Sequence, residues 1–247
     1  MGTVTLSSRM QAVADMVPLG SSVCDVGCDH GYVSIYLMEH AIAERVLAMD
    51  INQGPLQRAR EHVRRAGLSD YIEIRQSDGL RAFQAGEAQV LICAGMGGPL
   101  MQRILLEQPE KTASLKTLIL QPQSELAQFR FFLAKMGYSI TREDMILEEG
   151  KFYPVICAQT GGEPYELSAK QAEFGPLLLS ERNPVLFSFL QREEKKYALL
   201  RERLVQCGDS KRAQKRLFDL EEKRGLLEEA IADFEGQKGE ATWLRSK

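Results

Sequence analysis

The sequence has no excess of positive charge of the kind that marks many nucleic-acid-binding proteins. Its 34 Asp and Glu residues outnumber its 31 Lys and Arg residues, which gives a formal net charge of -3. Any contact with RNA or DNA must therefore come from a local basic patch. Apolar residues make up 44% of the 247 residues. A chain of this length and composition can bury a full core in one large domain or in a domain with an appendage.

The sequence also has no apolar run long enough to cross a bilayer. Its first residues, MGTVTLSSRMQAVADMV, show no charged segment followed by an apolar one, so neither export nor membrane insertion is expected. Cysteines are odd in number and lie mostly within apolar runs, which is typical of reduced core thiols in a reducing compartment. We therefore expect a cytoplasmic protein. The cysteines are Cys24, Cys28, Cys93, Cys157 and Cys207.

Short apolar runs alternate with helical patterns over the first two thirds of the chain. Strands are predicted over residues 21–27, 45–51, 71–77, 88–95, 115–122, 138–147 and 152–159. Helices are predicted over residues 6–17, 31–40, 54–66, 98–108 and 124–136. This alternation is typical of an α/β fold, a mostly parallel, Rossmann-like sheet of seven strands. No long helix separates the last two strands, so we expect them to form an antiparallel pair at the sheet edge.

The strand pattern ends at the segment TGGEPYELS, residues 160–168, where we place a boundary between domains 1–162 and 163–247. Beyond it, two apolar stripes with alternating spacings of four and three predict an antiparallel pair of coiled-coil helices, interrupted by Glu193 and Arg224. Gly208 to Ser210 would form the turn. Such an arm could grip a substrate, cover the core or dimerise. The stripes are Leu186, Leu190, Tyr197, Leu200, Leu204 and Cys207, then Ala213, Leu217, Leu220, Leu227, Ile231 and Phe234.

The segment VCDVGCDHGYVSIYL, residues 23–37, predicts a strand, a glycine turn and a helix, and Asp50 ends the next strand. This layout is generic for holding an adenosine group at the edge of a parallel sheet. Asp25 and Asp29 would repel the pyrophosphate of a dinucleotide. They would favour the sulfonium and amino groups of S-adenosylmethionine, which carries no phosphate. We therefore predict S-adenosylmethionine as the cofactor.

Other residues of the turn fit the same ligand. Gly27 and Gly31 let the backbone approach it, Asp50 can accept both ribose hydroxyls, and the Asp78–Gly79 pair can meet the adenine amine. Each Asp could instead cap a helix or a turn. A metal site is not expected, because Cys24, Cys28 and His30 lack a second ligand pair at zinc-binding spacing.

The fourth predicted strand ends in CAGMGGPL, where Gly95, Gly97 and Gly98 leave almost no side chain at the sheet edge. A flat base could lie against this backbone. A ring nitrogen such as adenine N1 already has an in-plane lone pair, so methylation there needs positioning more than proton removal. A tight turn that needs glycine for packing is the alternative interpretation.

Several blocks together resemble the bacterial tRNA (adenine-22-N1)-methyltransferase family over about the first 160 residues. They occur in the family's order: LSSRMQAV, DVGCDHGY, AMDI, SDGL, AGMGG, LILQP and ILEEGKFYPVI. The resemblance implies a class I methyltransferase domain with a C-terminal helical coiled-coil domain. It further implies S-adenosylmethionine as the methyl donor and adenosine 22 of tRNA as the acceptor. The base would have to leave its pairing contacts before reacting, because N1 lies on the Watson–Crick edge.

The resemblance also implies residue roles. Asp29 and His30 are the expected catalytic residues, and four residues are expected to contact the substrate: Arg9, Gln121, Pro122 and Tyr153. A cluster of arginines on the predicted helix 54–66 could contact phosphates, although a charge run on a helix is usually a solvated face: Arg58, Arg60, Arg64 and Arg65. The expected cofactor-binding residues are Asp25, Gly27, Cys28, Asp29, His30, Gly31, Asp50, Ile51, Asp78, Gly79, Gly95, Met96 and Gly97.

Two other functions stay open at this stage. The acidic net charge would suit a methyltransferase that acts on a small molecule or a protein. A non-catalytic RNA-binding protein could also keep this fold, although the intact DVGCDHG segment and Asp50 argue against it. The sequence does not determine the oligomeric state, for which a monomer is favoured.

Overall fold

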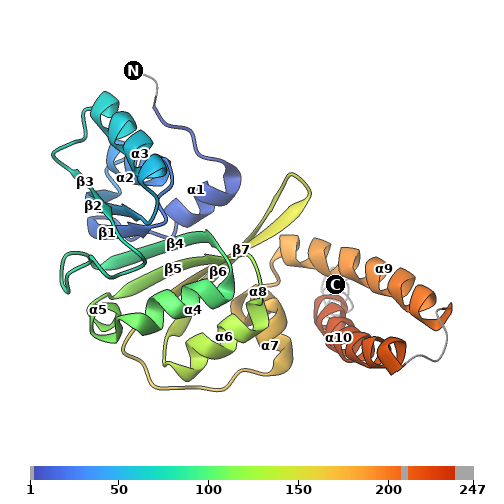
Figure 1. Cartoon of the computed structure of the whole chain (residues 1–247). Helices are drawn as coiled ribbons and strands as arrows, with labels where there is room; N and C mark the ends of the chain where they lie inside the picture. The colour runs from blue at the N-terminus through green and yellow to red at the C-terminus, as the bar shows by residue number, and fades with distance from the viewer. Residues whose placement is uncertain (1–2, 207–210, 237–247) are drawn as a thin grey trace, which may run out of the picture. The chain divides into compact units, whose positions relative to one another are not determined.

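The computed structural model describes residues 3–206 and 211–236 (Figure 1). It divides into two compact units, Met1–Glu166 and Leu167–Lys247. The division falls after residue 166, whereas the sequence predicted a boundary after residue 162. Residues 162–165 stay with the first unit because they bond to it: the Gly162 amide donates to the Gly137 carbonyl at 3.1 Å and the Tyr165 hydroxyl to the Tyr138 carbonyl at 3.1 Å.

The first unit contains a seven-stranded sheet in the order β3-β2-β1-β4-β5-β7-β6. Strands β1 to β5 run parallel, and β7 pairs antiparallel with both β5 and β6. The predicted seven-stranded Rossmann-like sheet and its antiparallel edge pair are confirmed. The strands are β1 (Ser21–Val26), β2 (Ala43–Asp50), β3 (Ile72–Gln76), β4 (Val90–Met96), β5 (Thr117–Pro122), β6 (Ser139–Glu148) and β7 (Lys151–Gln159).

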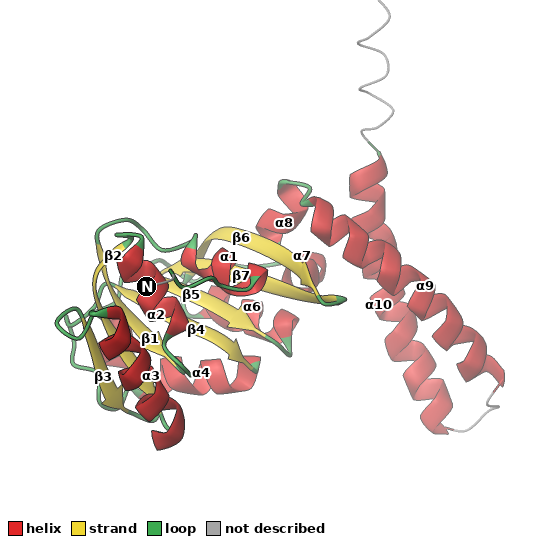
Figure 2. Ribbon diagram, turned by 90° about the horizontal axis from the view of Figure 1, so that it is seen from above, coloured by secondary structure: helices red, strands yellow, loops and turns green. Residues whose placement is uncertain are grey.

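Helices cover both faces of this sheet, with α1, α2 and α3 on one face and α4 and α6 on the other (Figure 2). The helix α1 is shorter than the predicted segment 6–17, because the chain passes into tight turns after Asp15. The helix α5 was not predicted. The helices are α1 (Ser8–Ala14), α2 (Tyr32–Glu39), α3 (Gln53–Ala66), α4 (Gly98–Glu107), α5 (Pro109–Ala113) and α6 (Leu126–Lys135).

Alternate residues of the central strands serve the two cores. Val23 and Ile92 pack in the core under α1 to α3, whereas Cys24 and Leu91 pack in the core under α4 and α6. All four side chains are buried. A parallel strand that is buried on both faces has a continuous apolar run in its sequence, which is why these strands could be predicted.

The second unit contains α7 (Ala169–Phe174), α8 (Pro176–Ser180), α9 (Pro184–Gln206) and α10 (Lys211–Glu235). The long helices α9 and α10 lie side by side, as the sequence predicted (Figure 1). The rings of Phe187 and Phe234 stack between them at 5.2 Å. Glu193, expected to interrupt the apolar stripe, is 6% exposed and lies 2.8 Å from Lys196 Nζ. The predicted turn at 208–210 and Cys207 lie outside the described residues.

A membrane-spanning helix would have to be both long and apolar. Within residues 3–206 and 211–236, no helix meets both conditions.

Candidate active site

A cavity of about 750 Å³ lies at the carboxyl ends of β1, β2, β3 and β4. It includes the point between β1 and β4 where the strand order reverses, which is where open α/β sheets bind ligands. Its volume is within the range of small-molecule sites. Most residues predicted to bind the cofactor line it, and they come from four successive strand ends. They are Asp25, Gly27, Cys28, Asp29, His30, Asp50, Ile51, Asp78, Gly79, Gly95 and Met96.

The turn after β1 is fixed against β2. The amides of Gly27 and Cys28 both donate to the Met49 carbonyl, at 2.8 and 3.0 Å. Gly27 has a φ of 76°, and a Cβ atom there would overlap the Met96 side chain. Asp29 also lies in the left-handed region, with a φ of 51°. Glycine at 27 is therefore favoured by the backbone conformation, because the atom in the way is only the flexible end of the Met96 side chain. Asp is one of the few side chains that tolerates the left-handed region at 29.

Two carboxylates stand at the centre of the site. Asp25 is buried and accepts a hydrogen bond from Ser34 Oγ at 2.7 Å. Burial, with a smaller contribution from the neighbouring charge of Asp50, raises the pKa of Asp25 to about 6, although the hydrogen bond from Ser34 opposes the rise. Asp50 accepts from the Asn52 amide at 2.8 Å and from the Asp29 amide at 3.4 Å. The second strand end is thus joined to the first turn through Asp50.

His30 lies at the mouth of the cavity between a carboxylate and a guanidinium. Its Nε2 is 3.4 Å from Asp29 Oδ1, and its Nδ1 accepts from Arg58 Nε at 3.0 Å. Because Nδ1 accepts, a neutral His30 carries its proton on Nε2, where it faces Asp29. The ring of Tyr32, which is 46% exposed, stacks on the ring of His62 at 5.0 Å beside it.

The third strand end contributes Asp78 and Gly79. Asp78 pairs with Arg81 and with Arg103, each at 3.3 Å, and Arg103 itself lines the cavity. The sequence did not predict either arginine. A Cβ atom at Gly79 would lie 3.1 Å from Ile104 Cγ1, and its φ is 57°, so this glycine allows α4 to approach the cavity wall.

The predicted glycine floor at the end of β4 serves two purposes. Gly95 has a φ of 77° and sits at a register shift between β4 and β5, and it lines the cavity. Gly98 lies away from it, where a Cβ atom would stand 2.7 Å from the Ser124 carbonyl. The alternative interpretation, a tight turn that needs glycine for packing, therefore fits Gly98 and the ligand-floor interpretation fits Gly95.

Two glycines predicted to bind the cofactor lie outside the cavity lining. Gly31 precedes α2 with a φ of 77°, and a Cβ atom there would lie 3.3 Å from Ala59 Cβ. Gly97 precedes α4, and a Cβ atom there would lie 3.0 Å from Ser124 Oγ. Both positions serve the packing of the helix that follows the turn.

Of the residues predicted to contact substrate, Arg9 lines the cavity, and Gln121, Pro122 and Tyr153 do not. Arg9 instead contacts two of them, Gln121 and Tyr153. Its Nη1 donates to Gln121 Oε1 at 3.5 Å, its guanidinium lies 5.3 Å from the centre of the Tyr153 ring, and its Nε lies 3.4 Å from Glu148 Oε2. Gln121 and Pro122 are buried. This cluster anchors α1 to β5 and to the β6–β7 hairpin.

The N-terminal segment forms a wall of the cavity, of which the sequence predicted Arg9 alone. Thr5, Leu6, Ser7 and Met10 line it together with Arg9. The Val4 amide donates to Glu39 Oε2 at 2.8 Å, which holds the segment against α2. The block LSSRMQAV, which carries part of the family resemblance, includes most residues of this wall and is the sequence signal for it.

A metal centre is not formed by the part of the chain that the structure describes, where no three His, Cys, Asp or Glu side chains are grouped as ligands. Cys24 and Cys28 are free and buried, and burial raises the pKa of both thiols above its ordinary value.

The sheet order and the acidic cavity at its switch point define a Rossmann-like methyltransferase domain. Residues 6–156 match the family model described as "Methyltransferase domain". The chain belongs to the tRNA (adenine(22)-N(1))-methyltransferase family, being 33% identical to the Bacillus subtilis enzyme of that name over 94% of this chain and 99% of the relative. The family predicted from the sequence is thereby confirmed.

Solved structures agree with this membership. The Bacillus subtilis m1A22 tRNA methyltransferase TrmK is 32% identical, with a TM-score of 0.82 over 92% of this chain and 99% of that chain. A putative tRNA (m1A22) methyltransferase from Streptococcus pneumoniae, solved in complex with S-adenosyl-L-methionine, is 33% identical, with a TM-score of 0.82 over 92% of this chain and 100% of that chain.

Proposed function

We propose that this protein transfers a methyl group from S-adenosylmethionine to N1 of adenosine 22 in tRNA. The carboxylate-lined cavity at the β1/β4 switch point carries the proposal. Two similarities support it: the near full-length match to the Bacillus subtilis tRNA (adenine(22)-N(1))-methyltransferase and the Streptococcus pneumoniae relative bound to S-adenosyl-L-methionine.

The residues present fit this cofactor. Asp25, Asp29, Asp50 and Asp78 give the cavity an acidic lining, which suits a ligand with a sulfonium and an amino group and no phosphate. Asp50 would accept the ribose hydroxyls, and Asp78 with Gly79 would hold the adenine end. Asp25 and Asp29 would face the cationic part. When bound, S-adenosylmethionine supplies the methyl group; the protein supplies position and charge.

Asp29 and His30 are the proposed catalytic residues. The side chain of Asp29 is 68% exposed at the cavity mouth, where an incoming base can reach it. Methylation at N1 places positive charge on the adenine ring, and a fixed carboxylate nearby stabilises that charge. His30, held between Asp29 and Arg58, would orient the base through Nε2. No proton has to leave N1 before the transfer, so neither residue is required as a general base.

The tRNA would be held by cations around the cavity. Arg9 lines the cavity, and Arg58, which bonds His30, lies on α3 with three further exposed arginines: Arg60, Arg64 and Arg65. These side chains are the proposed phosphate contacts, which fix register without reading sequence. The helical unit is proposed to hold the tRNA while the base leaves its pairing contacts. We also propose that the protein acts in the cytoplasm as a monomer.

Nucleoside mass spectrometry tests the function directly. A transcribed tRNA with adenosine at position 22 is incubated with the protein and S-adenosylmethionine, and 1-methyladenosine is expected. A matched transcript with guanosine at that position should gain no methyl group. Methylation of both transcripts would contradict the assigned position, and methylation of neither would contradict tRNA as the substrate.

A further inference from the structure

The connection between β3 and β4 forms the adenosine end of the cavity without any helix of its own. Residues 77–89 contain turns and bends alone, although they cross from the sheet edge past β2 and β1. Parallel strands are usually joined through a helix, whose backbone bonds keep the crossover rigid. Here the first residues of the connection, Ser77, Asp78 and Gly79, line the cavity. Something other than a helix must therefore hold them.

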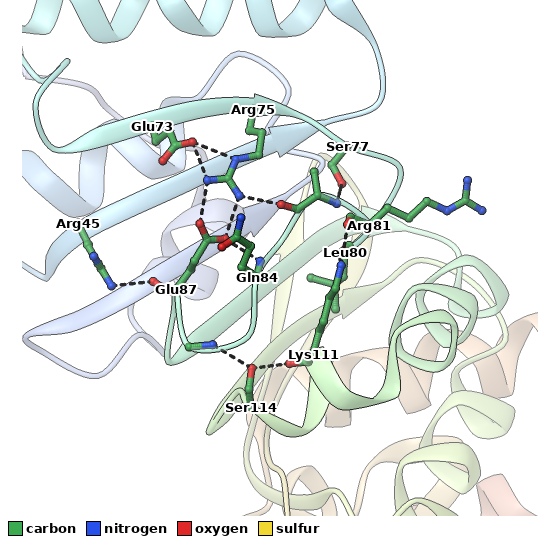
Figure 3. Close-up of polar contacts among 12 residues, drawn as sticks. Arg45, Glu73, Arg75, Ser77, Leu80, Arg81, Gln84, Glu87, Lys111 and Ser114 are labelled. Carbon is green, nitrogen blue, oxygen red and sulfur yellow. Dashed lines mark hydrogen bonds and ion pairs between the residues drawn. The ribbon is translucent and has the colours of Figure 1, made fainter.

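A guanidinium on β3 holds the connection in place (Figure 3). Arg75 donates to both carboxylate oxygens of Glu87, at 2.8 and 2.9 Å, and to the Ala82 carbonyl at 2.7 Å. Glu87 in turn accepts from the Gln84 amide at 2.7 Å. The forked bond fixes angle as well as distance, because two parallel N–H groups meet two oxygens. One side chain thus fastens the middle and the end of the connection to β3.

A second cation fastens the same connection from the other side. Lys111 of α5 donates to the carbonyls of Leu80 and Arg81, at 3.1 and 2.6 Å (Figure 3). The hydroxyl of Ser77 closes the turn between them, since it donates to the Gly79 carbonyl at 2.8 Å and accepts from the Ala82 amide at 3.0 Å. The cavity-lining pair Asp78–Gly79 therefore lies in a turn that is held at its far end by hydrogen bonds from both Arg75 and Lys111.

We propose that Arg75, Glu87 and Lys111 are positioning residues that set the affinity for the cofactor by holding Asp78 and Gly79 at the cavity wall. None of the three lines the cavity. This inference rests on the proposed function, because Asp78 and Gly79 are assigned to the adenosine end of S-adenosylmethionine there. Loosening the turn costs ordering free energy when the ligand binds, so affinity falls while the transfer step, at the other end of the cavity, is unaffected.

Titration calorimetry with S-adenosylmethionine tests the proposal on the full chain. We expect Glu87→Gln and Lys111→Met each to weaken binding by up to about tenfold, because ligand binding must then supply the ordering of the turn that the lost bond to a charged group provided. Glu73→Gln is the matched control. Glu73 also bonds Arg75, at 2.6 Å, but no bond joins it to the connection in the described structure, and its side chain is 61% exposed. Affinity should be unchanged in that variant.

Steady-state methylation of tRNA separates positioning from a loss of folded protein. A positioning role raises KM for S-adenosylmethionine and leaves kcat and KM for tRNA at their wild-type values. A merely structural role lowers the active fraction, so kcat falls and both KM values stay constant. That second pattern, or unchanged affinity in both Glu87→Gln and Lys111→Met, would overturn the inference. If the wild-type protein does not bind S-adenosylmethionine, the proposed function fails and the inference falls with it.

Discussion

The hydroxyl of Ser34 donates a 2.7 Å hydrogen bond to the buried carboxylate of Asp25, joining the first turn of α2 to the end of β1. Burial raises the pKa of Asp25 to about 6 despite this bond. Asp25 therefore changes its charge close to neutral pH, at the wall of a cavity proposed to hold a cationic ligand.

Cofactor affinity is expected to depend on the charge of Asp25. The raised pKa means that Asp25 is ionised above about pH 6 and protonated below it. A cationic ligand binds the ionised form, so affinity should be constant well above this pH and fall by up to about tenfold per unit below it. Calorimetry with S-adenosylmethionine from roughly pH 5 to pH 8 measures the dependence.

Two variants test whether Asp25 is the group responsible. Asp25→Asn should bind weakly and lose the pH dependence, whereas Ser34→Ala should move the midpoint to higher pH, because the Ser34 bond lowers the pKa of Asp25. Asp70→Asn, at an exposed carboxylate, should leave the curve unchanged. An unchanged curve in Asp25→Asn would contradict the assignment.

Substituting Gly27 should destabilise the protein about as much as substituting Gly67, because only the flexible end of the Met96 side chain stands in the way of a Cβ atom. Gly27 and Gly67 have similar φ values, 76° and 73°, but a Cβ atom at 27 would overlap Met96, and one at 67 would meet nothing within 4 Å. We expect Gly67→Ala and Gly27→Ala each to lower the free energy of unfolding by about 1–2 kcal/mol, the cost of the left-handed backbone. Denaturant unfolding measures both. A clearly larger loss in Gly27→Ala would show that the Met96 side chain cannot move aside.

The charge of Asp29 can be separated from its backbone conformation. Asparagine tolerates the left-handed region as aspartate does, so Asp29→Asn should keep the turn while removing the carboxylate. We expect kcat for tRNA methylation to fall by about 10- to 100-fold. His30→Gln, which keeps a side-chain amide near Asp29, should lose less. Wild-type kcat in Asp29→Asn would remove Asp29 from the catalytic residues.

Removing one partner of the ion pair between Arg130 and Glu143 should destabilise the protein, whereas replacing both partners with apolar residues should destabilise it much less. Arg130 Nε lies 2.8 Å from Glu143 Oε1, linking α6 to β6, and both side chains are fully buried. Arg130→Met removes the cation from beside a buried carboxylate, and a loss of about 3–5 kcal/mol in the free energy of unfolding is expected. The double variant with Glu143→Leu should recover much of it. If the double variant is as unstable as the single one, the apolar pair does not pack there.

Part of the site could be predicted because parallel strands end at one edge. Asp25, Asp50 and Asp78 each come at or just after a strand end, so local pattern alone placed them together. Gln121 and Pro122 also end a strand, but they do not line this cavity. β5 lies beyond β4 from the switch point, and Gln121 is turned toward Arg9 and buried there.

The wall formed by the N-terminal segment could not be predicted from local pattern. Arg9 meets Glu148 across 139 positions of sequence, and no periodicity within a short window contains such a contact. Arg75 and Lys111 hold the β3–β4 connection through contacts that local sequence pattern cannot predict either. In sequence both are ordinary surface-type cations, and Lys111 contacts Leu80 across 31 positions.

The amino-acid sequence by itself determined the alternation of strands and helices and the acidity of the strand ends, and with them the sign of the charge that the cavity accepts. These properties are local: they follow from side-chain burial along one strand and from the residue that comes next. Tertiary structure alone decided which polar side chains share the cavity and which hold its walls. That outcome depends on strand order and on contacts between distant segments, because a side chain's neighbours are set by packing and not by its place in the chain.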